Sequence, residues 1–167
     1  MARLTTMSMT AGRWLRLLRQ ARRASWAGRL FAAETLLCLV AARLVTKLLP
    51  FRWFSPGLGA WRHETRWDED AVHVVTADRI ARAMRQLAAC AAWSSNCLAQ
   101  ALAAQAMLRR RGIPSTLYVG IACGDALPTT HAWLRCGARI VTGSPVHARY
   151  TPVASYACEP SRRKWSG

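Results

Sequence analysis

Two residues in the C-terminal half of the chain have the types and the order needed for nucleophilic catalysis. Cys97 follows Ser94, Ser95 and Asn96, which are favoured helix N-caps, so it is expected at the start of a helix. Unpaired N–H groups at such a position favour the thiolate form of a cysteine. His131, expected on a later strand, could take and return the proton. The pattern predicts a Cys–His dyad; the alternative is a buried structural cysteine with a core histidine, both of which are common.

The elements that must position this pair are a helix and a small sheet. The helix is expected to run from Cys97 to about Arg111, because Gly112 and Pro114 stop it. Its predicted buried face consists of Leu98, Ala101, Leu102, Gln105 and Leu108. Strands are expected at residues 116–121, 131–134, 139–142 and 149–156, with a tight turn at Gly137-Ala138 and an edge position or bulge at Pro152.

The first half of the chain is predicted to be helical. Residues 25–49 have a dense apolar pattern that Pro50 ends, and a turn-rich aromatic connector and a charged loop follow at 51–61 and 62–75. Thr76 is the expected N-cap of a second helix. The apolar stripe of that helix is Ile80, Met84, Leu87 and Ala91. Helices first and a three- or four-stranded antiparallel sheet afterwards indicate an α+β fold.

Composition limits the classes of protein that fit. The chain has 167 residues, enough for one domain, and its 24 Lys and Arg against 8 Asp and Glu give a formal charge of +16. Such a charge suits nucleic acid, an acidic membrane or an acidic peptide, or reflects an arginine-rich coding bias. No recognised nucleic-acid motif is present, so no nucleic-acid partner is expected.

The predicted organisation has three parts. Residues 1–24 form a basic amphipathic helix or extension, residues 25–158 the domain, and residues 159–167 a basic tail. The first part is either a docking surface, with possible peripheral membrane contact, or a solvated helix face.

The six cysteines fit reduced thiols in the cytoplasm. They form neither a CxxC pair nor the spacing of a zinc site, so no metal or cofactor is expected. No secretory signal is recognisable, and the apolar run 30–42 is too short and too interrupted to span a bilayer. Cys123, in a Gly/Asp loop, is the main competitor for the nucleophile role. His63, His73 and His147 are expected at the surface.

Four segments, in this order, carry a resemblance to a known family: ETLLCLVAARLVTKLLPF, AAWSSNCLAQALAAQAMLRRRGIP, LYVGIA and THAWLRCGARIVTG. Over roughly residues 25–155 the chain resembles the transglutaminase-like leader peptidase of lasso-peptide biosynthesis. It resembles the split form, in which the peptidase and the leader-binding element are separate chains. The resemblance implies a cysteine protease, with Cys97 as nucleophile and His131 as its base.

One position departs from the family pattern. The aspartate expected about a dozen residues after the histidine is replaced by Gly143. Either a dyad suffices or another group orients the imidazole, and Asp125, in the loop before the histidine strand, is our first candidate for that group. The other candidates are Glu159, Asp78, Thr142 and a backbone carbonyl. The Cys97 amide is the expected first oxyanion donor, and Trp93 and Asn96 are positional guesses for the second. Trp133 is either a wall of the substrate groove or a core residue.

The resemblance also implies partners. These are the leader region of a precursor peptide, a separate leader-binding recognition protein and an ATP-dependent lasso cyclase. Two other functions stay open: a transglutaminase-like acyl transferase with the same dyad, and a non-enzymatic basic protein that binds nucleic acid or membrane.

Overall fold

The computed structural model describes residues 25–67, 70–90, 96–123 and 127–159. Three long helices dominate these ranges: α2 (Trp26–Leu48), α4 (Ala71–Cys90) and α5 (Cys97–Arg110). Two short turns of helix, α3 (Phe51–Phe54) and a 3₁₀ turn at Ser55–Leu58, follow α2, and another 3₁₀ turn lies at Val146–Arg149. None of the described helices is both long enough and apolar enough to cross a bilayer. Residues 1–24, predicted to be a basic amphipathic helix or extension, lie outside the described ranges.

The sheet has five antiparallel strands in the order β1-β5-β2-β3-β4. The strands are β1 (Ala60–Trp61), β2 (Ser115–Ala122), β3 (Thr129–Cys136), β4 (Arg139–Thr142) and β5 (Thr151–Cys158). Four of them are the predicted strands. The fifth, β1, was missed because two residues inside an aromatic connector carry no alternating pattern, yet they pair with Ala157 and Tyr156 of β5. The predicted α+β fold, helices first and antiparallel sheet afterwards, is confirmed.

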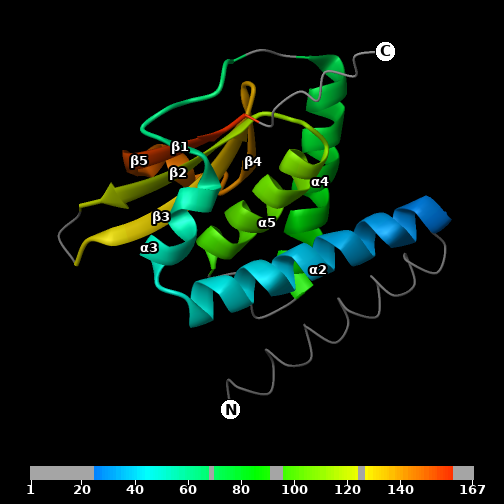
Figure 1. Ribbon diagram of the computed structural model, residues 1–167, viewed down its shortest axis with the longest axis horizontal. Coiled ribbons are helices and arrows are strands. Elements are labelled where there is room, and N and C mark those ends of the chain that lie inside the picture. Colours follow the sequence, from blue (N-terminus) through cyan, green and yellow to red (C-terminus); the bar gives the residue numbers. More distant parts are fainter. Residues whose placement is uncertain (1–24, 68–69, 91–95, 124–126, 160–167) are drawn as a thin grey trace.

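Helix α5 is the centre of the molecule. It packs against α2, α4 and the strands β2, β3 and β4, so that these elements enclose it (Figure 1). The prediction of a single buried face is therefore too narrow. Leu98 and Leu102 are only half-buried, whereas the small residues Ala99, Ala103 and Ala104 are buried. Alanine suits a helix surrounded on several sides, because it allows close approach of the neighbouring elements.

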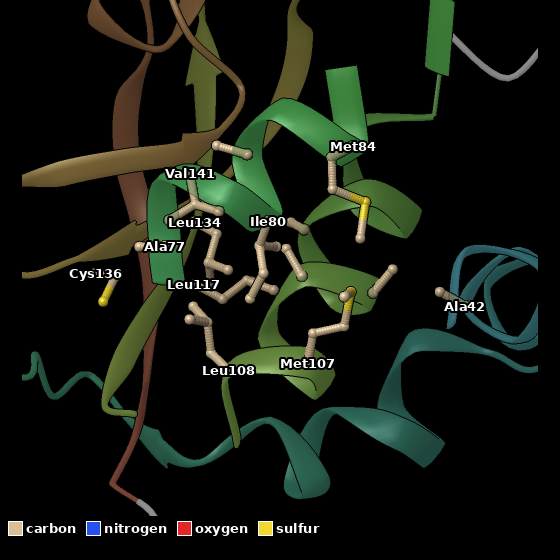
Figure 2. Close-up of a cluster of buried hydrophobic side chains, with 14 of the residues drawn as sticks. Ala42, Ala77, Ile80, Met84, Met107, Leu108, Leu117, Leu134, Cys136 and Val141 are labelled. Carbon is tan, nitrogen blue, oxygen red and sulfur yellow. The ribbon is translucent and has the colours of Figure 1, made fainter. Parts of the chain in front are cut away.

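The hydrophobic core lies between α5 and one face of the sheet. Figure 2 shows side chains of α4, α5 and the sheet meeting there; those labelled include Ile80, Met84, Met107, Leu117, Leu134 and Val141. On β3 these core residues alternate with His131, Trp133 and Arg135, which therefore face the other side of the sheet. The histidine is thus carried on the sheet face that α5 does not cover.

A buried arginine fixes the segment that covers this second face. Arg135 is 2% exposed, and its guanidinium donates to the Tyr118 hydroxyl at 3.0 Å and to the carbonyls of Gly137 and Thr65, each at 2.8 Å. It also stacks on the Trp67 ring, 4.2 Å from its centroid. Because buried charge is costly unless its donors are satisfied, these contacts hold residues 65–67 against the sheet.

The start of α4 differs from the prediction. The helix begins at Ala71, five residues before Thr76, which was expected to be its N-cap. The Asp70 carboxylate accepts a hydrogen bond from the Val72 amide at 2.9 Å, which is the contact that a capping side chain makes. The error arose because Val72, Val74 and Val75 are β-branched and were assigned to the preceding loop.

Candidate active site

Cys97 is the first residue of α5, as predicted. The helix is capped by Asn96, whose side-chain oxygen accepts from the Ala99 amide at 3.0 Å. The amide group of the same side chain donates to the Thr46 hydroxyl of α2 at 3.4 Å. Cys97 is half-buried and lies where the first amides of a helix have no helical acceptor.

The Cys97 sulfur lies against the strand that carries His131. The amide of Ala132, the residue after His131, donates to Cys97 Sγ at 3.4 Å. This contact is available because β4 pairs only with residues 134–136 of β3, so no strand of the described ranges lies beside Ala132 on that edge. The helix start and the histidine strand, separate in the sequence, are therefore brought together at one free strand edge.

His131 is held by a backbone carbonyl. Its Nε2 lies 3.1 Å from the carbonyl oxygen of Gly143, the residue that follows the end of β4. A carbonyl can only accept, so Nε2 carries the proton of the neutral ring. The lone pair consequently resides on Nδ1, which is the nitrogen available as a base.

The position where the family pattern has an aspartate therefore still orients the ring, but through its main chain. Gly143 has φ +87°, a conformation that favours glycine. A Cβ built at this residue would lie 2.5 Å from the Trp133 Cβ and 3.0 Å from His131 Nε2. No side chain fits there without movement of the backbone. The carbonyl takes the place that a carboxylate would occupy.

Two aromatic rings lie beside the imidazole. The Tyr150 ring centroid lies 5.0 Å from that of His131, and Trp133 stacks with His131 at 6.2 Å and with Tyr118 at 5.3 Å. Gly120, paired with His131 across the strands, makes room for this row: a Cβ there would lie 2.7 Å from the Trp133 ring. The row restricts the ring orientations open to His131.

The structure decides between the two alternatives for Trp133 and corrects the expectation for His147. Trp133 is 5% exposed, so the core alternative holds and it does not line an open groove. His147, expected at the surface, is half-buried with its Nδ1 enclosed, and its ring lies 6.2 Å from that of Trp133. The 3₁₀ turn at 146–149 places His147 there. The sequence did not predict this burial, because a short turn after Gly-Ser-Pro has no periodic apolar pattern.

Within the described residues, none of the other proposed orienting groups forms a hydrogen bond with the imidazole. Asp125 lies outside the described residues. The Thr142 hydroxyl is buried and makes no hydrogen bond within the described part of the chain. Glu159 lines a hollow of about 690 Å³ together with Arg109, at the opposite end of α5 from Cys97. Among the described residues, the Gly143 carbonyl is the group that contacts Nε2.

The second oxyanion donor is not identified. The Asn96 side-chain oxygen caps α5, and its NH2 group donates one N–H to Thr46, which leaves the second N–H as a possible oxyanion donor. Trp93 lies outside the described residues. The Cys97 amide keeps its predicted place in the first turn.

The remaining described thiols differ from Cys97 in their surroundings. Burial raises the pKa of Cys136 to about 11 and also raises the pKa of Cys158 and of Cys38. Cys123 is exposed, as its loop predicted. Within the described ranges, no group of three or more His, Cys, Asp or Glu side chains is arranged to hold a metal ion.

Comparison with known proteins gives one match. The sequence model of a family described as the transglutaminase-like superfamily matches residues 36–155, which include Cys97, His131 and Gly143. No curated protein and no solved structure matches the chain. The matched range covers most of the helices and all strands except the last residues of β5.

Proposed function

Since the chain belongs to the transglutaminase-like superfamily, we propose that it is a cysteine peptidase that removes the leader from a lasso-peptide precursor. The superfamily groups enzymes whose cysteine thiolate attacks an acyl carbon, which makes hydrolysis and acyl transfer the two natural reactions. The peptidase assignment rests on the sequence segments around Cys97 and His131 that resemble lasso leader peptidases.

The observation that carries the proposal is the contact of Cys97 Sγ with the Ala132 amide while Gly143 holds His131 from the other side. In the proposed mechanism, His131 Nδ1 takes the thiol proton and the Cys97 thiolate attacks the scissile carbonyl. The Cys97 amide stabilises the oxyanion. The imidazolium then protonates the leaving amine, the acyl group stays on sulfur as a thioester, and water activated by Nδ1 releases the leader.

The proposal includes three partners. A separate leader-binding protein would present the cleavage site of the precursor, and an ATP-dependent cyclase would close the ring on the released core peptide. The recognition chain is needed because a peptidase of the split type has no leader-binding element of its own. The reaction needs no cofactor.

Incubation of the purified chain with the precursor and the leader-binding protein, followed by mass spectrometry, tests the function. We expect cleavage at one bond, and loss of at least about a thousandfold in rate for Cys97→Ala, because triad-type residues act as a unit. Cys123→Ala is the matched control and should cleave at the unchanged rate. Cleavage by Cys97→Ala would exclude the mechanism.

The same fold could instead transfer an acyl group to an amine. This alternative predicts that a primary amine added to the reaction appears as an amide on the product, while the precursor alone is left uncut. Free leader carboxylate as the main product, with or without amine, supports the peptidase.

A further inference from the structure

Helix α2 has two apolar faces, and within the described part of the chain only one of them is buried against other elements. Thr35, Leu39 and Ala42 are buried against the domain. On the opposite side, large exposed side chains are spaced four or seven residues apart, which keeps them on one face of the helix: Trp26, Leu30, Leu37, Leu44 and Leu48. Leu37 and Leu48 are 68% and 70% exposed, which is far more than the fold requires of a leucine. We call these five residues, together with Ala33 and Ala41 between them, the outer stripe.

The outer stripe has the relief of a helix-packing surface. The exposed alanines Ala33 and Ala41 lie on either side of Leu37, and leucines follow beyond them. Large and small residues thus alternate along the helix, which forms ridges and hollows for the side chains of a second helix. Insertion into a lipid bilayer requires only an apolar face and not such hollows. Apolar residues at a three-to-four spacing match the side-chain spacing of a partner helix.

Charge indicates the chemistry of that partner. Lys47 lies beside the outer stripe and is exposed, and Arg43 lies one turn earlier on the same side. The one acidic residue of α2, Glu34, is bound by Arg111 at 2.6 Å and lies 3.7 Å from Arg110. The stripe therefore offers positive charge at its border and no carboxylate to neutralise it. A partner helix with acidic residues along its flank would complement it.

The charges also argue against two other occupants. Residues 13–23 of this chain contain five arginines, so that segment brings the same sign of charge. The outer stripe of a second copy offers no free carboxylate to Lys47. We propose that α2 docks an acidic amphipathic helix of another protein on the outer stripe. This inference does not depend on the reaction at Cys97.

A peptide-binding experiment on the full chain tests the proposal. The probe is a fluorescent synthetic helix of four heptads with Leu at positions a and d and Glu at e and g, and the matched probe has Lys at e and g. By anisotropy the Glu probe should bind and the Lys probe should not. Leu37→Glu should weaken binding by at least about tenfold, since it buries a charge in the seam. Val75→Glu, at an equally exposed site on α4, should have no effect.

Charge reversal makes the test sharper. The double change Arg43→Glu with Lys47→Glu should weaken binding of the Glu probe and allow the Lys probe to bind, with the fold checked by circular dichroism. Failure of the Glu probe to bind, or binding that Leu37→Glu leaves intact, would overturn the proposal. So would Leu37-dependent binding to phosphatidylglycerol vesicles without peptide binding, or a doubled solution mass that Leu37→Glu abolishes.

Discussion

The residue that distinguishes this dyad is Gly143. Its carbonyl orients His131 as a carboxylate would, and it fixes the proton on Nε2. A neutral acceptor, however, contributes less to the stability of an imidazolium than a carboxylate does. In the proposed dyad, the imidazolium therefore has less electrostatic support than an aspartate would give it. Orientation must come from the main chain and from the rings of Trp133 and Tyr150.

Gly143→Ala tests this role. The added Cβ meets Trp133 and His131 in a backbone with positive φ, so we expect about 1–3 kcal/mol lower stability and a kcat reduced by about 10- to 100-fold. Gly57→Ala is the control, because a Cβ there meets nothing within 4 Å and φ is not positive; it should leave kcat unchanged. Chemical denaturation and steady-state kinetics give both values. A full kcat in Gly143→Ala would mean that the carbonyl does not orient the imidazole.

Sequence reasoning placed Cys97 at a helix start and His131 on a strand, and it included a backbone carbonyl among the groups that could hold the imidazole without saying which one. Cys97 could be placed because cap residues precede it and helical spacing follows. The sequence could not single out the Gly143 carbonyl, because every residue has the same main-chain carbonyl and only the fold determines which one lies beside the imidazole. The contact between Ala132 and Cys97 depends on where β4 ends, which side-chain patterns do not record.

At the scale of elements, α5 is positioned by its N-cap. The Asn96 side chain accepts a hydrogen bond from the first turn of α5 and donates one to Thr46 of α2. The cap therefore also determines where Cys97 lies. We expect Asn96→Ala to lower the stability by about 0.5–2 kcal/mol and to reduce activity as well. Ser25→Ala removes the equivalent cap of α2, where the hydroxyl accepts from the Gly28 amide.

The comparison of the two cap variants separates stability from positioning. The unfolding temperature should fall in both variants, whereas the cleavage rate of the folded protein should fall only in Asn96→Ala. Equal activity in the two variants would show that the cap stabilises α5 without positioning the sulfur.

The errors of prediction at this scale have physical causes. Strand β1 exists because Ala60 and Trp61 meet β5, a tertiary pairing without local preference. Helix α4 includes three valines that favour strands in isolation, but burial of Ala77, Ile80 and Met84 outweighs that preference. The predicted bulge near Pro152 is confirmed, since the register shifts there between β2 and β5.

At the scale of the whole molecule, ion pairs from Glu34 to Arg110 and Arg111 join α2 to the end of α5. Glu34 of α2 binds Arg111 just after α5, and this hydrogen bond is the main reason why the pKa of the Glu34 carboxyl is lowered. A lowered pKa contributes stability above the unfolded value of 4.5, and this contribution is lost as the pH falls through the folded value.

We therefore expect Glu34→Gln to lower the free energy of unfolding at pH 7 by about 0.5–1 kcal/mol. The unfolding temperature should fall accordingly. The difference from the unmodified protein should vanish at acidic pH, where Glu34 is protonated in both states. A difference independent of pH would mean that the variant acts through packing rather than through the carboxylate.

The central claim is that Cys97 is the activated thiol, and its alkylation rate is the most direct test. Iodoacetamide is applied to the native protein, and the rate at each cysteine is followed by peptide mass spectrometry. Exposure alone predicts that Cys123 reacts faster than the half-buried Cys97. Activation by the helix start and His131 predicts that Cys97 reacts faster than Cys123. Cys136 and Cys158 should react slowest, because burial raises their pKa. His131→Ala should slow the alkylation of Cys97. Faster alkylation of Cys123, or a Cys97 rate unaffected by His131→Ala, would contradict the claim.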